Sequence, residues 1–223
     1  MFRILHENVI FNAGIVGTMP RSALILAGGK GKRFGYKEKA LIEIEGTPVI
    51  SRIISTLEPL VDEIIISLRD KHQYDLLAPV MGKLPTAFDE QEGVGPLAGI
   101  LAGLKAASYE YIFVTACDMP FPDPKIVEFL FSRSKGHDCA LIKRKNGSYE
   151  PLCAVYRVCL LIPLIEKSIR DNRYFILSPV FEMNDMVEVD IAEIEKMDPF
   201  FACLQNINTL DDLRAVRNDF NGS

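Results

Sequence analysis

Residues 22–39 read SALILAGGKGKRFGYKEK, an apolar run that leads directly into a glycine-rich segment. A nearly continuous apolar run is typical of a parallel strand covered on both faces, so residues 22–27 predict a buried strand. The segment that follows carries five cations against one acid: Lys30, Lys32, Arg33, Lys37 and Lys39 against Glu38. Glycines let backbone N–H groups approach a ligand closely, and clustered cations attract a polyanion. Residues 28–39 therefore predict a binding loop for a nucleoside triphosphate.

Apolar runs and amphipathic helical patterns alternate beyond this loop. Further strands are predicted over residues 62–68, 85–88 and 111–116. Prolines typical of a first helical turn indicate three helix starts: Pro48 after the cap residue Thr47, Pro96, and Pro124 after the cap residue Asp123. The β-α-β-α order predicts a three-layer α/β fold around a doubly wound, mostly parallel sheet.

The C-terminal part predicts a smaller, mixed portion of the fold. Residues 138–143 and 149–156 are typical of a hairpin that turns at Asn146-Gly147, and Pro151 assigns the second strand to an edge or a bulge. The remaining elements are a helix, a short strand and a final helix, predicted over 159–170, near 186–190 and from Thr209.

Residues 1–18 have no clean helical or strand period, and they lack the long apolar core and cleavage site of a signal peptide. We interpret them as an N-terminal extension, either dispensable or the product of a start codon assigned too early. Residues 19–223 are interpreted as one domain.

Composition narrows the class of protein. With 25 Lys and Arg against 30 Asp and Glu, the formal net charge of −5 argues against general nucleic-acid binding. The five cysteines are odd in number and form no C-x-x-C pair, which favours reduced thiols and a cytoplasmic location over a disulfide framework or a zinc site. No apolar run reaches the roughly 18–20 residues that span a bilayer, so no membrane association is expected.

Three kinds of glycine loop bind phosphates, and their spacing separates them. A Walker loop needs Ser or Thr after Gly-Lys, but Arg33 follows Gly31-Lys32. A dinucleotide-binding loop needs a third glycine at position 34, which is Phe. A nucleotidyl-transfer loop, with a strand, G-G-x-G-x-R-F-G and a later lysine, matches at every position. This hypothesis assigns Arg33 and Lys39 to the phosphates, and a glycine-rich turn with solvated charges is the alternative.

Nucleotidyl transfer needs little covalent chemistry from the protein. The attacking group can be a phosphate oxygen of the second substrate, already anionic at neutral pH. The requirements are then in-line positioning, a metal ion, and cations that offset charge on the leaving pyrophosphate. The apolar run 111–116 delivers Asp118 to the carboxyl edge of the sheet, where a lone carboxylate suits Mg²⁺. We therefore predict Asp118 as the metal ligand, with a turn or cap residue as the alternative.

Five sequence blocks resemble one known family, in the same order: LAGGKGKRFG with Lys39, Asp89 followed by GVGPLAGI, ACDMPF, EPLCAVY and NINTLDDL. Over roughly residues 21–215 the chain is similar to the molybdenum cofactor guanylyltransferases, which join GMP from GTP to the phosphate of molybdopterin and release pyrophosphate. The resemblance implies a Rossmann-like nucleotidyltransferase fold, Mg²⁺ as cofactor, and GTP and molybdopterin as substrates. It also implies transient contacts with cofactor-pathway proteins or molybdoenzymes.

The resemblance also implies the residues of the site. Those of the nucleotide site are Leu26, Ala27, Gly28, Gly29, Lys39, Ser67, Asp89, Gly95 and Asp118. Arg33, Lys39 and Asp118 are the implied catalytic residues. For the second substrate we predict Lys143, beside the basic hairpin turn, and Asn206 and Asn208, at family positions. A solvated hairpin tip and a helix cap are the respective alternatives. Gly99 and Gly103 allow either a close approach to the nucleotide or ordinary helix packing.

Three positions depart from the family pattern. Glu38 stands where Asp usually precedes the loop lysine, Ser67 stands where an asparagine often holds the nucleotide, and Leu210 replaces a proline. Ser67 leaves the base preference open. Similar glycine loops serve three related reactions, which are the alternatives: cytidylyl transfer to molybdopterin, guanylyl transfer to a corrinoid or phospholactate precursor, and sugar-phosphate activation. A non-catalytic nucleotide sensor is a hypothesis of a different class, although Lys39 and Asp118 are both present.

Overall fold

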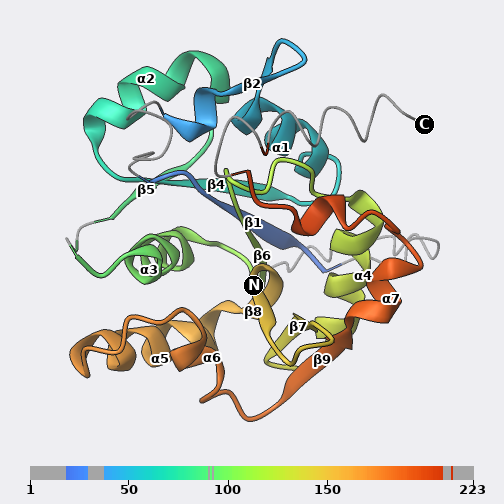
Figure 1. The fold of residues 1–223 in the computed structure, drawn as a ribbon. Coiled ribbons are helices and arrows are strands. Elements are labelled where there is room, and N and C mark those ends of the chain that lie inside the picture. Colours follow the sequence, from blue (N-terminus) through green and yellow to red (C-terminus); the bar gives the residue numbers. More distant parts are fainter. Residues whose placement is uncertain (1–18, 30–37, 90, 92, 208–211, 213–223) are drawn as a thin grey trace, which may run out of the picture.

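The structure is a computed structural model, and it describes residues 19–29, 38–89, 91, 93–207 and 212. Its centre is a seven-stranded sheet with the strand order β5-β4-β1-β6-β8-β7-β9 (Figure 1). The strands are β1 (Arg21–Leu26), β4 (Glu63–Leu68), β5 (Thr86–Phe88), β6 (Tyr111–Ala116), β7 (Cys139–Lys143), β8 (Tyr149–Arg157) and β9 (Met186–Asp190). Strand β8 runs antiparallel to both of its neighbours, while the other pairs in the sheet are parallel.

Helices cover both faces of this sheet, as the predicted three-layer fold requires. They are α1 (Val49–Leu57), α2 (Lys71–Met81), α3 (Pro96–Ala106), α4 (Pro124–Ser134), α5 (Val158–Arg170), α6 (Leu177–Val180) and α7 (Ile191–Glu195). Short elements complete the described part: the 3₁₀ turns η2 (Lys39–Leu41) and η3 (Ala202–Leu204), and a hairpin of β2 (Glu43–Ile44) and β3 (Thr47–Pro48).

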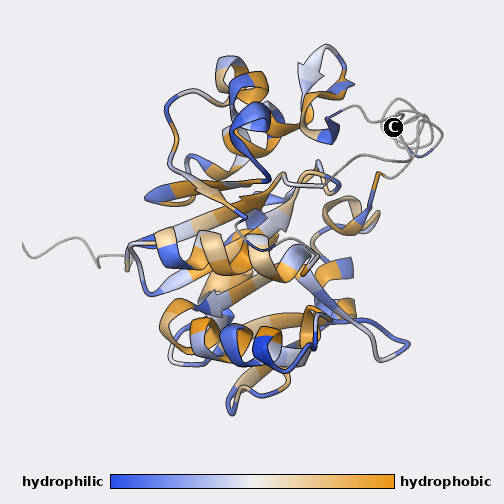
Figure 2. Ribbon diagram, turned by 90° about the vertical axis from the view of Figure 1, so that its left-hand side faces the viewer, coloured by the Kyte–Doolittle hydropathy of each residue, from blue (hydrophilic) through white to orange (hydrophobic). Residues whose placement is uncertain are grey.

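Alternation along the strands separates two apolar layers. In β1, Ala23 and Ile25 belong to an apolar layer that also contains residues of α1, α2, α4 and α7, whereas Leu24 belongs to a second layer with residues of α3, α5 and α6. All three side chains are fully buried. Figure 2 shows the same division, with mainly hydrophobic strands in the middle and hydrophilic residues gathered on the outer helices and loops. The predicted α/β class with a mostly parallel sheet is confirmed.

Most predicted elements are found within one residue of their expected bounds. The strand over 111–116 matches in full, and helices α3 and α4 begin at Pro96 and Pro124. Asp123 caps α4, accepting a hydrogen bond from the Lys125 N–H at 2.7 Å. The hairpin of β7 and β8 is also present, with Gly147 at φ +82° in its turn. The register shifts opposite Pro151, so this proline lies in a bulge rather than on an edge strand.

The predicted helix start at Thr47 is wrong. Thr47 pairs with Ile44 in the β2–β3 hairpin, whose turn residues Glu45 and Gly46 have positive φ angles of 53° and 76°. Pro48 is extended and is the N-cap, so α1 begins one residue later, at Val49. Because Thr47 is paired with Ile44 in the hairpin, it lies before the N-cap position and does not cap α1.

Three predicted segments lie wholly or largely outside the described residues: the extension 1–18, residues 30–37 of the predicted binding loop, and the final helix from Thr209 apart from Asp212. Among the helices of the described residues, none combines the length and the hydropathy of a membrane span.

Candidate active site

Sheet register brings three chain segments to the same level. Leu26, the last residue of β1, pairs with Ser67 of β4 on one side and with Ala116 of β6 on the other. Backbone hydrogen bonds continue past the strand ends, from Ala27 N–H to the Ser67 carbonyl at 2.9 Å and from Cys117 N–H to the Leu26 carbonyl at 3.0 Å. The strand order reverses between β1 and β6, which is the point where open α/β sheets form a ligand crevice.

A cavity of about 800 Å³ opens at this edge of the sheet. This volume lies within the range of small-molecule sites. Its lining residues are Leu26, Ala27, Gly28, Gly29, Lys39, Ser67, Arg69, Asp70, Asp89, Gln91, Gly93, Gly95, Pro96, Gly99, Ala116, Cys117, Asp118 and Leu152. Every residue predicted for the nucleotide site is among them. The structure thus brings the predicted set together, while the role of each residue stays a prediction.

Lys39 and Asp118 face each other within the cavity. The Lys39 Nζ lies 3.9 Å from Asp118 Oδ2, and the two side chains are 21% and 29% exposed. The other carboxylate oxygen, Asp118 Oδ1, is buried and has no hydrogen-bond partner among the described residues. An orphaned buried carboxylate oxygen is costly unless a cation or donor completes it, so this atom fits a role as a metal ligand.

The donor set around Asp118 fits one kind of metal site. Within the described ranges, no cluster of three or more His, Cys, Asp or Glu side chains could hold an ion by itself. Mg²⁺ is commonly bound through one or two carboxylates, with waters and substrate phosphates as the other ligands. Asp118 therefore fits a Mg²⁺ ion that arrives with a phosphorylated substrate.

The backbone on both sides of Asp118 is fixed. Its carbonyl accepts a hydrogen bond from Ile207 N–H at 2.7 Å, which holds Ile207 against the site.

The neighbouring Cys117 lines the cavity, but burial raises the pKa of its thiol, so the thiol stays protonated and is not a nucleophile at neutral pH. The chemistry of this cavity thus depends on charge and positioning.

The described residues that we predicted for the second substrate, Asn206 and Lys143, do not line the cavity. Asn206 precedes Ile207 and is exposed, so it lies close to the site along the chain without lining the cavity. Lys143 ends β7, separated from β6 by β8, and its ammonium lies 2.7 Å from a Glu188 carboxylate oxygen. Asn208, like the predicted catalytic residue Arg33, lies outside the described residues.

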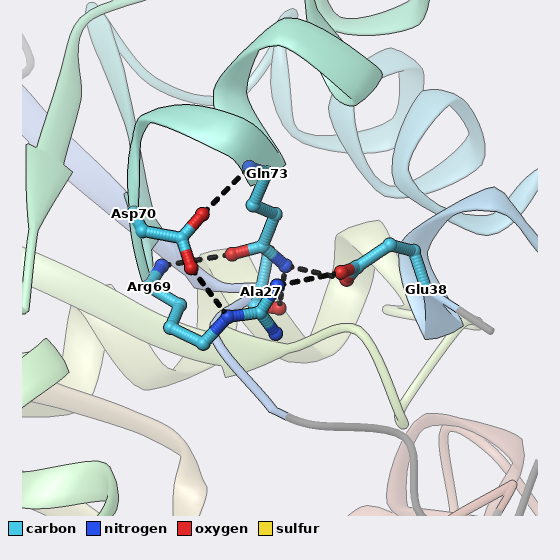
Figure 3. Close-up of polar contacts among 5 residues, drawn as sticks. All are labelled: Ala27, Glu38, Arg69, Asp70 and Gln73. Carbon is cyan, nitrogen blue, oxygen red and sulfur yellow. Dashed lines mark hydrogen bonds and ion pairs between the residues drawn. The ribbon is translucent and has the colours of Figure 1, made fainter. Parts of the chain in front are cut away.

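Helix α2 contributes polar residues that we did not predict from the sequence. Arg69 and Asp70 precede α2 and line the cavity. Figure 3 shows them in contact with Glu38 and Gln73. The guanidinium lies 2.8 Å from Glu38 Oε1 and 2.8 Å from Asp70 Oδ2, and hydrogen bonds to these two carboxylates raise the pKa of Arg69. Asp70 caps α2 by accepting from Gln73 N–H at 2.7 Å. This bond, followed by the one from Arg69, lowers the pKa of the Asp70 carboxyl. The spacing Asp70-x-x-Gln73 is a helix-start pattern that could have revealed this element.

The two glycines of α3 have different surroundings. A Cβ at Gly99, which lines the cavity, would lie 2.9 Å from Ser67 Oγ. One turn later, a Cβ at Gly103 would lie 2.3 Å from Leu24 Cδ1 in the core. Gly103 therefore serves helix packing, and Gly99 leaves room at the cavity wall beside Ser67.

The MobA-like NTP transferase domain family matches residues 23–178 of the chain. The chain is 44% identical over 205 residues to the probable molybdenum cofactor guanylyltransferase of Methanosarcina acetivorans. The aligned residues cover 89% of this chain and 91% of that protein. It is also 44% identical over 198 residues to the protein of the same name from Methanosarcina mazei, covering 86% and 88%. A similar solved structure is molybdopterin-guanine dinucleotide biosynthesis protein A from Archaeoglobus fulgidus, with a TM-score of 0.77 at 27% identity, covering 91% of this chain and all of that one.

Proposed function

The chain belongs to the MobA-like NTP transferase family, and on this premise we propose that it is a molybdenum cofactor guanylyltransferase. It transfers GMP from GTP to the phosphate of molybdopterin and releases pyrophosphate. The observation that carries the proposal is the pair Lys39 and Asp118, 3.9 Å apart in the cavity at the switch point of the sheet. A cation and a carboxylate with an unpartnered oxygen are the two charges that a metal-bound triphosphate requires.

In the proposed reaction, an oxygen of the molybdopterin phosphate attacks the α-phosphorus of GTP. The bond from this phosphorus to the oxygen that bridges the α- and β-phosphates breaks, and its electron pair leaves with pyrophosphate. No general base is needed, because the attacking phosphate is already anionic. The protein's task is to hold the two phosphates in line and to offset the negative charge that builds on the leaving group.

The cavity residues divide this task. We assign Lys39, Gly28 and Gly29 to the phosphates, because all three line the cavity and offer an ammonium group and close-approaching backbone N–H groups. Asp118 would hold Mg²⁺ through Oδ1, and the bound ion supplies charge neutralisation for the α-phosphate and the pyrophosphate. We assign Arg33 to the same phosphates, as its place in the loop motif indicates.

The base and its ribose are assigned to the part of the cavity lined from β4, β5 and the start of α3. Ser67, Asp89 and Gly95 belong to this part of the lining, and Gly99 keeps space beside the Ser67 hydroxyl. The same proposal includes three further points: GTP is the nucleotide, the protein is cytoplasmic, and it makes transient contacts with proteins that deliver or receive the cofactor.

Mass spectrometry of the products formed from GTP, Mg²⁺ and molybdopterin tests the reaction. We expect molybdopterin guanine dinucleotide together with one pyrophosphate per transfer. Nucleotide binding without pyrophosphate release would instead identify a nucleotide sensor, and product formation only with another acceptor would identify a related guanylyltransferase.

Thermal-shift titrations with GTP, CTP and ATP, each with Mg²⁺, test the base. A ligand that binds the native state raises the melting temperature according to its affinity, so GTP is expected to give the largest shift. Stabilisation by CTP alone would contradict guanylyl transfer and favour the cytidylyl reaction.

A further inference from the structure

The side chain of Gln73 is fully buried and uses both ends of its amide (Figure 3). Its Nε2 donates to the Ala27 carbonyl at 2.8 Å and to Glu38 Oε2 at 2.7 Å. Its Oε1 accepts from the Arg69 N–H at 2.8 Å. One amide therefore joins the end of β1, the residue before η2 and the junction of β4 with α2.

Glu38 is the second fixed point of this arrangement. Its side chain is 12% exposed, and each carboxylate oxygen has its own partner: Oε1 accepts from Arg69 and Oε2 accepts from Gln73. Asp70 holds the guanidinium of Arg69 from the other side at 2.8 Å. Hydrogen bonds to charged groups are stronger than neutral ones, and such bonds hold their groups most firmly where they are buried, as they are at Gln73.

The position of this network in the chain gives it a consequence for the site. Ala27 and Glu38 flank the glycine-rich segment 28–37 on its two sides, and Lys39 follows Glu38 directly. Gln73 thus ties together the residues where the loop begins and ends. The backbone at Lys39 is thereby held in a position from which the Lys39 ammonium lies 3.9 Å from Asp118 Oδ2.

We propose that Gln73 is a positioning residue for Lys39, acting through Glu38. The residue touches no substrate: it sets the place from which Lys39 meets the nucleotide phosphates. The effect on turnover rests on the proposed function, whereas the effect on nucleotide affinity requires only that the cavity binds a nucleoside triphosphate. Small displacements of a catalytic group are costly, up to about a hundredfold in rate for a shift of about 1 Å.

A double-mutant cycle with Lys39 tests the proposal. Gln73→Leu removes the amide while keeping the approximate side-chain volume, and it is expected to weaken binding of GTP with Mg²⁺ about tenfold. In a Lys39→Ala background the same change is expected to weaken GTP binding less than twofold, because the group that Gln73 positions is absent. Equal factors in both backgrounds would overturn the proposal, as would an unchanged GTP affinity in a folded Gln73→Leu protein.

Leu77→Ala serves as the matched control in the same helix. Leu77 is fully buried in α2 and does not line the cavity. This variant is expected to lower the melting temperature while leaving GTP affinity within twofold of the parent in either background. It separates general weakening of α2 from loss of the Gln73 contacts.

Glu38→Met removes the same contact from its other partner and keeps the approximate side-chain length. It is expected to show the same coupling to Lys39→Ala, so the test does not depend on the folding of one variant. If neither variant folds, the network determines folding and the proposal fails. If the parent binds GTP but transfers nothing to molybdopterin, the proposed function fails, and the binding cycle still decides the role of Gln73.

Discussion

Gly95→Ala is expected to weaken nucleotide binding through backbone strain alone. Gly95 is the N-cap of α3 and lines the cavity, with φ +73° and ψ −148°. This combination is accessible to glycine and strained for other residues. A Cβ at this position would meet no atom within 4 Å, so the substitution adds no steric clash.

The structure supplies a matched control in Gly82. This glycine is the C-cap of α2, has φ +68° and ψ −150°, and also leaves a Cβ without neighbours within 4 Å. It does not line the cavity. Gly82→Ala therefore introduces the same strain at a place where no nucleotide contact is predicted.

The magnitude follows from the strain. A non-glycine residue in this region costs about 1–3 kcal/mol. At about 2–4 °C per kcal/mol for a chain of this size, each variant is expected to melt about 2–12 °C lower. If the Gly95 loop relaxes, binding must restore its geometry, and the same 1–3 kcal/mol corresponds to about five- to more than a hundredfold in the GTP dissociation constant.

Calorimetric titration of GTP with Mg²⁺, together with melting curves without ligand, measures both effects. We expect similar melting temperatures for the two variants and weakened binding only for Gly95→Ala. If Gly82→Ala lost as much affinity, or if Gly95→Ala melted lower but kept its affinity, the assignment of Gly95 to the nucleotide site would be refuted.

Further changes test the metal ligand, the core and the charge at the start of α2. Asp118→Ala is expected to abolish pyrophosphate release without lowering the melting temperature, since Oδ1 has no partner to lose and Oδ2 makes only a long, part-exposed ion pair with Lys39; robust transfer would refute the metal assignment. Gly103→Ala crowds Leu24, which costs about 1–3 kcal/mol, while the higher helix propensity of alanine returns about 1 kcal/mol. The free energy of unfolding, measured with urea, is therefore expected to fall by up to about 2 kcal/mol. A more stable variant would mean that α3 moves away from Leu24. The lowered pKa of Asp70 means that its ionised form stabilises the fold above the unfolded value of about 3.9, and that this contribution is lost as pH falls through the folded pKa. The stability difference between the parent and Asp70→Asn, measured by urea unfolding, should therefore be constant from about pH 6 to 8 and shrink below about pH 4; a difference that grows in acid would contradict this.

The sequence predicts the sheet edge well because parallel strands end at one level. Each strand that matters is a continuous apolar run, and Leu26, Ser67 and Ala116 then meet through register alone. Asp118 follows two residues after Ala116, so its place at this edge can be predicted without any knowledge of side-chain contacts.

Helix α2 could not be predicted from the sequence, for physical reasons. Its first turn is polar, and Pro79 lies inside the helix, where a proline normally argues against one. The contacts of Gln73 join residues 46 and 35 positions away in the chain. No local pattern encodes such distances, and only the cap spacing from Asp70 to Gln73 was available as a local indication.

The two charged groups of the site are therefore held by different means. Asp118 is fixed by backbone hydrogen bonds of the sheet edge and of Ile207, whereas Lys39 is connected to the sheet edge by the side-chain network of Glu38, beside the backbone bonds of η2. This difference gives a physical meaning to the departure at position 38. An aspartate there would be shorter by one methylene, about 1.5 Å, and could not keep both contacts, to Arg69 and to Gln73, without a shift of the backbone. Because that backbone leads directly into Lys39, the length of the side chain at position 38 and the identity of the residue at position 73 are linked, and both bear on where the ammonium meets the phosphates.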